Sequence, residues 1–199
     1  SNKKWTATSL NTQGASFYLK GNYEKALQYY SKSLAMRKEI DYKDGMGASY
    51  HSIGTVYYSQ GNYEKALEFY SKGVAMHKEL ENKKALSKSY NNIGIIYKEQ
   101  GNYEKALKYY LKSFAIREEL GDKNGMGGSY NNIGNIYSDQ GNYEKTLEYY
   151  SKSLVIYKDL GDKRGMGTSY NNIGIICVNV LTLKQLTVCL YPTFSLYDI

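Results

Sequence analysis

The stretch Gly101-Asn102-Tyr103-Glu104-Lys105 decides the fold, because the same five residues also begin at Gly21, Gly61 and Gly141. Successive copies are 40 residues apart each time. A fixed period of roughly 20 to 50 residues is the signature of repeat architectures. The chain of 199 residues is therefore a repeat protein.

The residues before Gly101 have helical spacing. Tyr90, Ile93, Gly94 and Tyr97 follow i, i+3, i+4, i+7 and share one helical face, which predicts a first helix, helix A, in each repeat. The copies align without gaps. The four leading tyrosines are Tyr50, Tyr90, Tyr130 and Tyr170, the four glycines are Gly54, Gly94, Gly134 and Gly174, and Cys177 takes the slot of Tyr97 in the fifth copy.

A second apolar stripe predicts helix B. It comprises Tyr103, Ala106, Leu107, Tyr110, Phe114 and residues 116–120. Between the helices, Gly101 supplies a left-handed residue that ends helix A, and Asn102 is placed to cap helix B. In the linkers 120–125 and 160–165, Gly is expected to end helix B, and Asp to cap the next helix A. Each unit is thus a helical hairpin of about 40 residues.

Small residues are expected where helices A and B cross. The pairs are Gly14/Ala26, Gly54/Ala66, Gly94/Ala106 and Gly134/Thr146. A lone hairpin cannot bury its aromatic stripe, so neighbouring hairpins must stack into a solenoid with a continuous core. Most of the 24 tyrosines are assigned to this core, with the ring between helices and the hydroxyl at the edge.

The spacing resembles the tetratricopeptide repeat signature at Tyr90, Ile93, Gly94, Tyr97, Gly101, Tyr103, Ala106 and Tyr110. The resemblance covers about residues 5–177 and implies an all-α, right-handed superhelical solenoid of stacked antiparallel hairpins. The 40-residue period, with Gly-Asp-Lys linkers, looks like Pins/LGN-type scaffolds or the repeat arrays of bacterial signalling proteins. Kinesin light chains are more distant relatives.

The domain prediction is a repeat array over residues 1–177, with about four full repeats and the first helix of a fifth. Residues 178–199 form a non-repeat tail, in which Leu181 and Leu183 replace the expected Gly and Tyr. Two interpretations of this tail are consistent with its sequence: an artefact of a frameshift or truncation, or a genuine segment that caps the array. The start at Ser1 suggests a fragment.

Composition argues against several partners. The net charge is +7, but the excess is scattered without a basic block, so no nucleic-acid partner is expected. No apolar run reaches the roughly 18 residues needed to span a bilayer, so no membrane partner is expected either. We expect a cytoplasmic protein.

Catalytic chemistry has no support in the sequence. The two histidines, His51 and His77, have no cysteine or paired carboxylate at ligand spacing, and both are interpreted as surface residues. The Gly-Met-Gly segments at residues 45, 125 and 165 lack the features of phosphate loops and are interpreted as helix starts. The prediction is a protein that is not an enzyme and has no cofactor and no metal.

The resemblance implies that the A helices line the concave side of the superhelix, so their residues beside the buried stripe predict a peptide-binding groove. These residues are Asn11, His51, Thr55, Lys88, Asn91, Asn92, Ile95, Lys98, Asn131, Asn132, Asn135, Asn171 and Asn172. Each amide offers a donor and an acceptor to the backbone of an extended peptide. Alternatively, the asparagines bond neighbouring helices or water. The family's clamp for C-terminal carboxylates is not expected, because only Lys88 fits a basic slot.

The leading functional prediction is a protein–protein interaction scaffold that binds an extended peptide segment in this groove. One alternative is the sensory or assembly segment of a larger signalling protein. Another is a structural array that self-associates through its uncapped ends.

Overall fold

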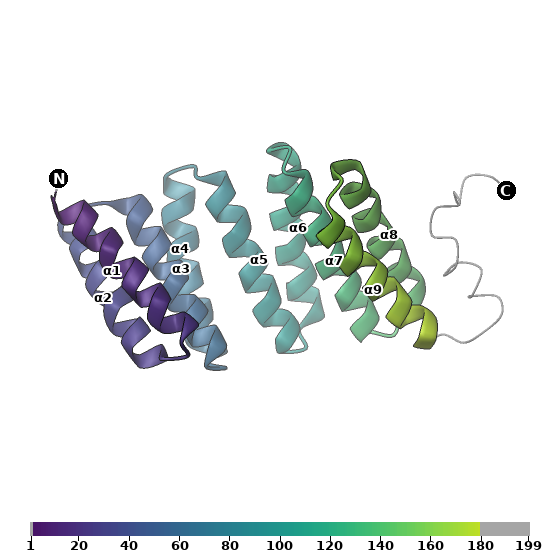
Figure 1. Ribbon diagram of the computed structural model, residues 1–199, viewed down its shortest axis with the longest axis horizontal. Coiled ribbons are helices and arrows are strands. Elements are labelled where there is room, and N and C mark those ends of the chain that lie inside the picture. Colours follow the sequence, from purple (N-terminus) through teal and green to yellow (C-terminus); the bar gives the residue numbers. More distant parts are fainter. Residues whose placement is uncertain (1, 180–199) are drawn as a thin grey trace. The chain divides into compact units, whose positions relative to one another are not determined.

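The computed structural model describes residues 2–179, which form two compact units divided at Gly101 (Figure 1). Across these residues the chain contains nine α-helices and no strand, which confirms the all-α prediction. The last helix ends at Asn179, and the remainder of the predicted tail, residues 180–199, lies outside the described residues.

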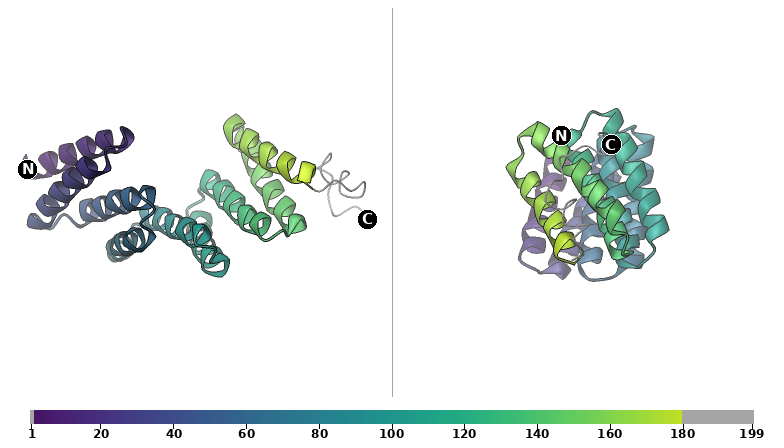
Figure 2. Two further views of the ribbon diagram at one scale, coloured as in Figure 1. Left: turned by 90° about the horizontal axis from the view of Figure 1, so that it is seen from below. Right: turned by 90° about the vertical axis from the view of Figure 1, so that its right-hand side faces the viewer.

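The first unit consists of five helices: α1 (Asn2–Leu19), α2 (Tyr23–Glu39), α3 (Lys43–Ser59), α4 (Tyr63–Glu79) and α5 (Lys83–Glu99). The second unit consists of four: α6 (Tyr103–Glu119), α7 (Lys123–Asp139), α8 (Tyr143–Leu160) and α9 (Lys163–Asn179). Odd-numbered helices are the predicted A helices. Antiparallel hairpins form from α1 and α2, α3 and α4, and α7 and α8, and each next helix packs on its predecessor within its unit (Figure 2).

Local signals place the helix ends as predicted. The side chains of Asn22, Asn62, Asn102 and Asn142 each accept a hydrogen bond at 3.1 Å from the backbone N–H three residues on, which caps the B helices. The preceding glycines have left-handed backbones, with φ between 71° and 73°. Asp122 caps α7 by accepting from the N–H of Gly125.

The residue that ends helix B is left-handed in all four repeats but is glycine in only two. Gly121 and Gly161 have φ of 64° and 65°, whereas Asp41 and Glu81 have φ of 48° and 51°. A side chain in this region costs about 1–2 kcal/mol, because its Cβ approaches the backbone carbonyl. The first two linkers therefore hold strain that the last two avoid.

Exchanging the residues between linkers tests this strain. Glu81→Gly should raise the free energy of unfolding by about 1 kcal/mol, and Gly121→Glu should lower it by a similar amount. Urea unfolding followed by circular dichroism measures both changes. Unchanged midpoints in both variants would show that the left-handed backbone carries no cost here.

The crossing of helices A and B depends on a tyrosine ring that packs against a glycine. A Cβ on Gly54 would lie 2.8 Å from Cδ1 of Tyr70, and a Cβ on Gly134 would lie 2.6 Å from Cδ1 of Tyr150. Gly14 has the same relation to Tyr30, at 2.7 Å. The small residues predicted opposite the glycines, Ala26, Ala66, Ala106 and Thr146, are fully buried. Where contacts are described, however, the atoms nearest the glycine belong to the tyrosine four residues further along helix B.

Further aromatic pairs close each hairpin. Phe17 stacks on Tyr29 with ring centroids 5.2 Å apart, and Tyr137 stacks on Tyr149 at 5.4 Å. Between hairpins, the guanidinium of Arg37 on α2 donates to the carbonyl of Gly45 and the hydroxyl of Ser49 on α3. Burial lowers the pKa of this guanidinium, and its hydrogen bonds join consecutive repeats.

A methyl group on the crossing glycine of helix A should destabilise the hairpin only where a tyrosine ring of helix B packs against that glycine. Gly134→Ala should cost about 1–3 kcal/mol, because the tyrosine ring must move. Gly174→Ala is the matched control, since a Cβ on Gly174 would have no neighbour within 4 Å among residues 2–179. It should be neutral or stabilise α9 by up to about 1 kcal/mol through helix propensity. Thermal unfolding compares the two, and equal losses would contradict the tyrosine contact.

Candidate functional site

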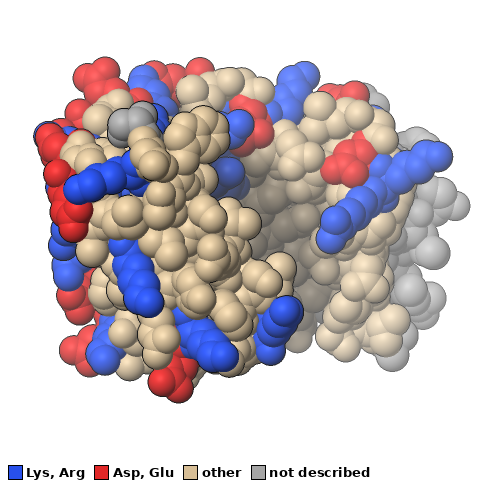
Figure 3. Space-filling model, turned by 60° about the vertical axis from the view of Figure 1, so that its left-hand side comes forward, with Lys and Arg blue, Asp and Glu red and all other residues tan. Residues whose placement is uncertain are grey.

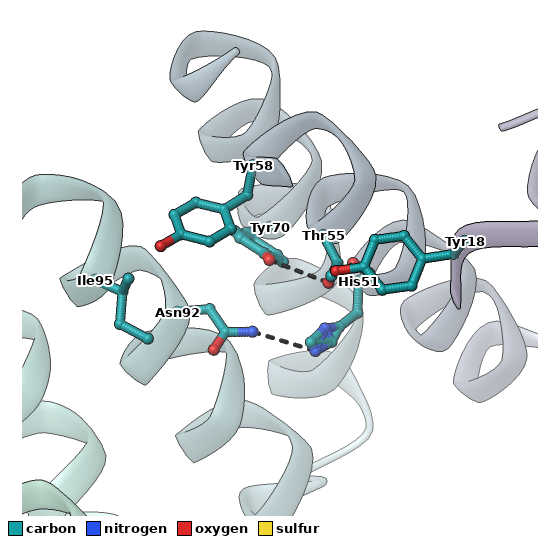
Figure 4. A pocket seen from close by; sticks show the side chains of 7 residues that line it. All are labelled: Tyr18, His51, Thr55, Tyr58, Tyr70, Asn92 and Ile95. Atoms are coloured by element: carbon teal, nitrogen blue, oxygen red, sulfur yellow. Dashed lines mark hydrogen bonds between the residues drawn. The ribbon is translucent and has the colours of Figure 1, made fainter. Parts of the chain in front are cut away.

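A pocket of about 400 Å³ opens in the first unit on the A helices (Figure 4). Three successive A helices and one B helix supply its walls. The lining residues are Tyr18 from α1, His51, Thr55 and Tyr58 from α3, Tyr70 from α4, and Asn92 and Ile95 from α5.

His51 lies between α4 and α5 as a neutral ring. Its Nε2 lies 3.2 Å from Nδ2 of Asn92, and its ring centroid lies 5.4 Å from that of Tyr70. Burial lowers its pKa to about 4, and the positive charges of His77 and Lys88 act in the same direction. With Nε2 accepting from the amide, the proton resides on Nδ1, a buried atom that has no hydrogen-bond partner in the described part of the chain.

The hydroxyl groups of the pocket are held in place by other side chains. The hydroxyls of Thr55 and Tyr70 are 3.1 Å apart, and the hydroxyl of Tyr18 lies 2.9 Å from that of Ser59. Burial raises the pKa of both Tyr58 and Tyr70, which keeps these phenols protonated. The pocket combines aromatic surface with fixed polar groups, and none of its lining side chains carries a charge at neutral pH.

Four predicted groove residues meet in this pocket: His51, Thr55, Asn92 and Ile95. Tyr70, which the repeat pattern assigned to the core, also lines the pocket. The sequence pattern could have indicated this second role of Tyr70, because a tyrosine whose ring lies between helices presents its hydroxyl at their edge. The interpretation of His77 as a surface residue is wrong, whereas His51 is half-buried and lines the pocket. His77 is only 4% exposed and packs against Gly47, because the glycine leaves room for its ring.

The other predicted groove residues do not line this pocket. On the first unit, Asn11 is half-buried on α1, and Lys88, Asn91 and Lys98 lie on α5. On the second unit, Asn131, Asn132 and Asn135 lie on α7, and Asn171 and Asn172 lie on α9. Oδ1 of Asn135 accepts a hydrogen bond from the Tyr150 hydroxyl at 2.6 Å, so this amide bonds a neighbouring helix. Asn131 is buried, and its Oδ1 has no hydrogen-bond partner among residues 2–179.

Charged side chains are mixed on the surface. At the N-terminal end, Lys and Arg lie interspersed with Asp and Glu around a middle of other side chains (Figure 3). Within residues 2–179, the His, Cys, Asp and Glu side chains form no cluster of three or more that could hold a metal ion. No described helix is long and apolar enough to cross a membrane.

Stacked helical hairpins with a 40-residue period define a helical repeat protein of the solenoid class. The family model described as "Tetratricopeptide repeat" matches residues 5–79 and 125–178, and a second model with the same description matches residues 87–120. The chain belongs to the tetratricopeptide repeat family. No curated protein matches it.

Solved structures share the fold at low sequence identity. BtubC from P. vanneervenii aligns at a TM-score of 0.82 and 18% identity, over 96% of this chain and 79% of that one. Aspartyl phosphate phosphatase F from Bacillus subtilis aligns at a TM-score of 0.78 and 19% identity, over 96% of this chain and 52% of that one. A signal transduction ATPase with a tetratricopeptide repeat sensor, from Pyrococcus horikoshii, aligns at a TM-score of 0.81 and 18% identity, over 96% of this chain and 31% of that one. The chain thus spans about half and about a third of the last two.

Acid should destabilise the first unit through His51. In the unfolded chain, His51 binds a proton below the ordinary histidine pKa of about 6.5. In the folded chain, the His51 ring stays neutral until about pH 4. The free energy of unfolding should therefore fall between about pH 6.5 and pH 4, by roughly 3 kcal/mol. Urea unfolding at a series of pH values measures this loss.

His51→Asn is the matched control, because four other repeats have asparagine at this position: Asn11, Asn91, Asn131 and Asn171. The variant should lose most of the decrease in the free energy of unfolding at acid pH. It should retain the part due to His77, because burial also lowers the pKa of that side chain. The same acid loss in both proteins would assign the effect to other groups.

Proposed function

We propose that the chain is a non-catalytic interaction scaffold that binds an extended peptide segment of another protein along its A helices. The observation that carries this proposal is the uncharged pocket of about 400 Å³ on three successive A helices. A peptide that crosses α1, α3 and α5 would meet one A helix per repeat, and the pocket would receive one of its side chains.

The chemistry of the pocket favours an uncharged anchor. A lysine or carboxylate that entered it would lose hydration without meeting an opposite charge, which costs several kcal/mol. A large aromatic or apolar side chain would bury its surface against Tyr18, Tyr58 and Ile95. The size of the pocket lies within the roughly 300–1,000 Å³ of typical ligand pockets. The Asn92 amide would hydrogen-bond the peptide backbone beside the anchor.

On the second unit, considered by itself, we propose that asparagines of the A helices also contact peptide backbone. Asn171 is exposed on α9, and Asn132 and Asn172 are half-buried at the register of Asn92. Asn135 contributes less in this proposal, because its Oδ1 already accepts from Tyr150. The proposed pocket for the anchor side chain lies within the first unit.

Selection from a random-peptide display library on the immobilised full chain tests the proposal. The selected peptides should share one aromatic or large apolar residue. Ile95→Lys places a cation in the pocket and should weaken their binding at least about tenfold, measured by isothermal titration calorimetry.

Leu111→Lys is the matched control, since Leu111 is 52% exposed on α6 and does not line the pocket. This variant should bind the selected peptides as the parent does. A library that yields no shared anchor, or peptides that bind both variants equally well, would exclude the pocket as the binding site.

A further inference from the structure

The hydroxyl groups of the pocket in the first unit form a chain of hydrogen bonds with a fixed direction. Oγ1 of Thr55 donates its proton to the backbone carbonyl of His51, at 3.0 Å. The hydroxyl of Tyr70 lies 3.1 Å from the same Oγ1. Because a threonine hydroxyl has only one proton, Tyr70 donates in this second hydrogen bond and Thr55 accepts. The Tyr70 proton is therefore already used inside the wall of the pocket.

The hairpin of α7 and α8 has the same direction of donation. Asn135 and Tyr150 stand two repeats after Thr55 and Tyr70, and the Tyr150 hydroxyl donates to Oδ1 of Asn135 at 2.6 Å. Burial raises the pKa of Tyr70, and it raises that of Tyr150 to about 12, so both phenols keep their proton at neutral pH. The crossing tyrosine thus donates in both described hairpins that have a polar residue after the crossing glycine. The other repeats have an apolar residue there: Ala15, Ile95 and Ile175.

These hydrogen bonds leave an acceptor on Asn92. Its Nδ2 lies 3.2 Å from Nε2 of the neutral His51 ring, to which it donates. Burial raises the pKa of Tyr70, and a hydrogen bond from Asn92 partly offsets this rise, so the amide nitrogen serves both rings. Oδ1 of Asn92 points away from His51 (Figure 4). Tyr70 does not donate to this oxygen while Thr55 holds its proton. An acceptor beside aromatic surface favours a ligand that brings a hydrogen-bond donor.

The charges near His51 favour a donor without a positive charge. Burial lowers the pKa of His51, and the positive charge of Lys88 lowers it further, so Lys88 acts on this end of the pocket. None of the lining side chains is an acid that would offset this charge. An ammonium or guanidinium group beside Asn92 would therefore be repelled. A neutral hydroxyl or N–H group would meet no such repulsion.

Tyr58 distinguishes between the aromatic side chains that carry a neutral donor. Its ring extends from α3 toward α5, and burial raises its pKa, so its hydroxyl remains a donor (Figure 4). A tyrosine hydroxyl in the pocket could donate to Asn92 and accept from Tyr58, whereas an indole N–H could only donate. Serine and threonine bring a donor but too little apolar surface for a pocket of about 400 Å³. The groups of the pocket thus fit a phenol best.

We propose that the anchor of the bound peptide is a tyrosine, whose ring packs beside Tyr58 and Ile95 and whose hydroxyl donates to Oδ1 of Asn92. Thr55 determines this specificity through Tyr70, because it holds the Tyr70 proton away from Asn92. The assignment rests on the proposed peptide-binding function and narrows its aromatic or apolar anchor to one side chain.

Isothermal titration calorimetry of the full chain with one peptide in three forms tests the anchor. The probe is the tightest peptide from the display selection, synthesised with tyrosine, phenylalanine or O-methyltyrosine at the anchor position. The tyrosine form should bind at least about tenfold more tightly than the phenylalanine form, which leaves Oδ1 of Asn92 dehydrated and unpaired. The O-methyl form keeps the oxygen without the proton, so it should bind no better than the phenylalanine form.

Thr55→Val tests the role of the hydroxyl chain. The variant keeps the shape of threonine and frees the Tyr70 proton for Asn92, so the preference for tyrosine over phenylalanine should fall to within about threefold. Thr12→Val is the matched control. Thr12 also donates to the backbone carbonyl four residues earlier, that of Thr8 at 3.2 Å, but it is exposed and does not line the pocket. This control should keep the full preference.

The outcomes separate this proposal from the function on which it rests. Equal affinities for the tyrosine and phenylalanine forms, both weakened by Ile95→Lys, would overturn the tyrosine anchor and leave the peptide pocket supported. A preference for tyrosine that survives in Thr55→Val would overturn the role of Thr55. Binding that Ile95→Lys leaves unchanged would contradict the proposed function itself, and the tyrosine anchor with it.

Discussion

The close contact between a tyrosine ring of helix B and a glycine of helix A sets the geometry of each described hairpin. With Gly14, Gly54 and Gly134 under Tyr30, Tyr70 and Tyr150, the two helices approach at a distance that no side chain on helix A would allow. The stacked aromatic pairs and the buried small residues depend on this approach. Stacking of hairpins then buries the outer face of each helix B.

The same contact builds the candidate site. Because the Tyr70 ring is held on Gly54, its hydroxyl emerges beside Thr55 at the wall of the pocket. His51 packs against the same ring and is desolvated there, which keeps it neutral. The packing that defines the repeat thus also produces an uncharged, preorganised pocket. On α9, no ring of residues 2–179 packs against Gly167 or Gly174.

Periodicity predicted the helices, their caps and the left-handed glycines, because these features depend on residues near in sequence. It also placed His51, Thr55, Asn92 and Ile95 on one surface. It missed Tyr70, whose position depends on how two helices cross, and the burial of His77, which depends on the glycine opposite. The left-handed conformations of Asp41 and Glu81 were not predicted either, since the repeat register imposes them against local preference.

Nuclear magnetic resonance of the full chain labelled at glycine tests the central contact most directly, because a tyrosine ring displaces the resonances of protons packed against it. The α-proton resonances of Gly14, Gly54 and Gly134 should be displaced by ring currents, and those of Gly174 should have ordinary shifts. Ordinary shifts at Gly54 and Gly134, or the same displacement at Gly174, would contradict the account.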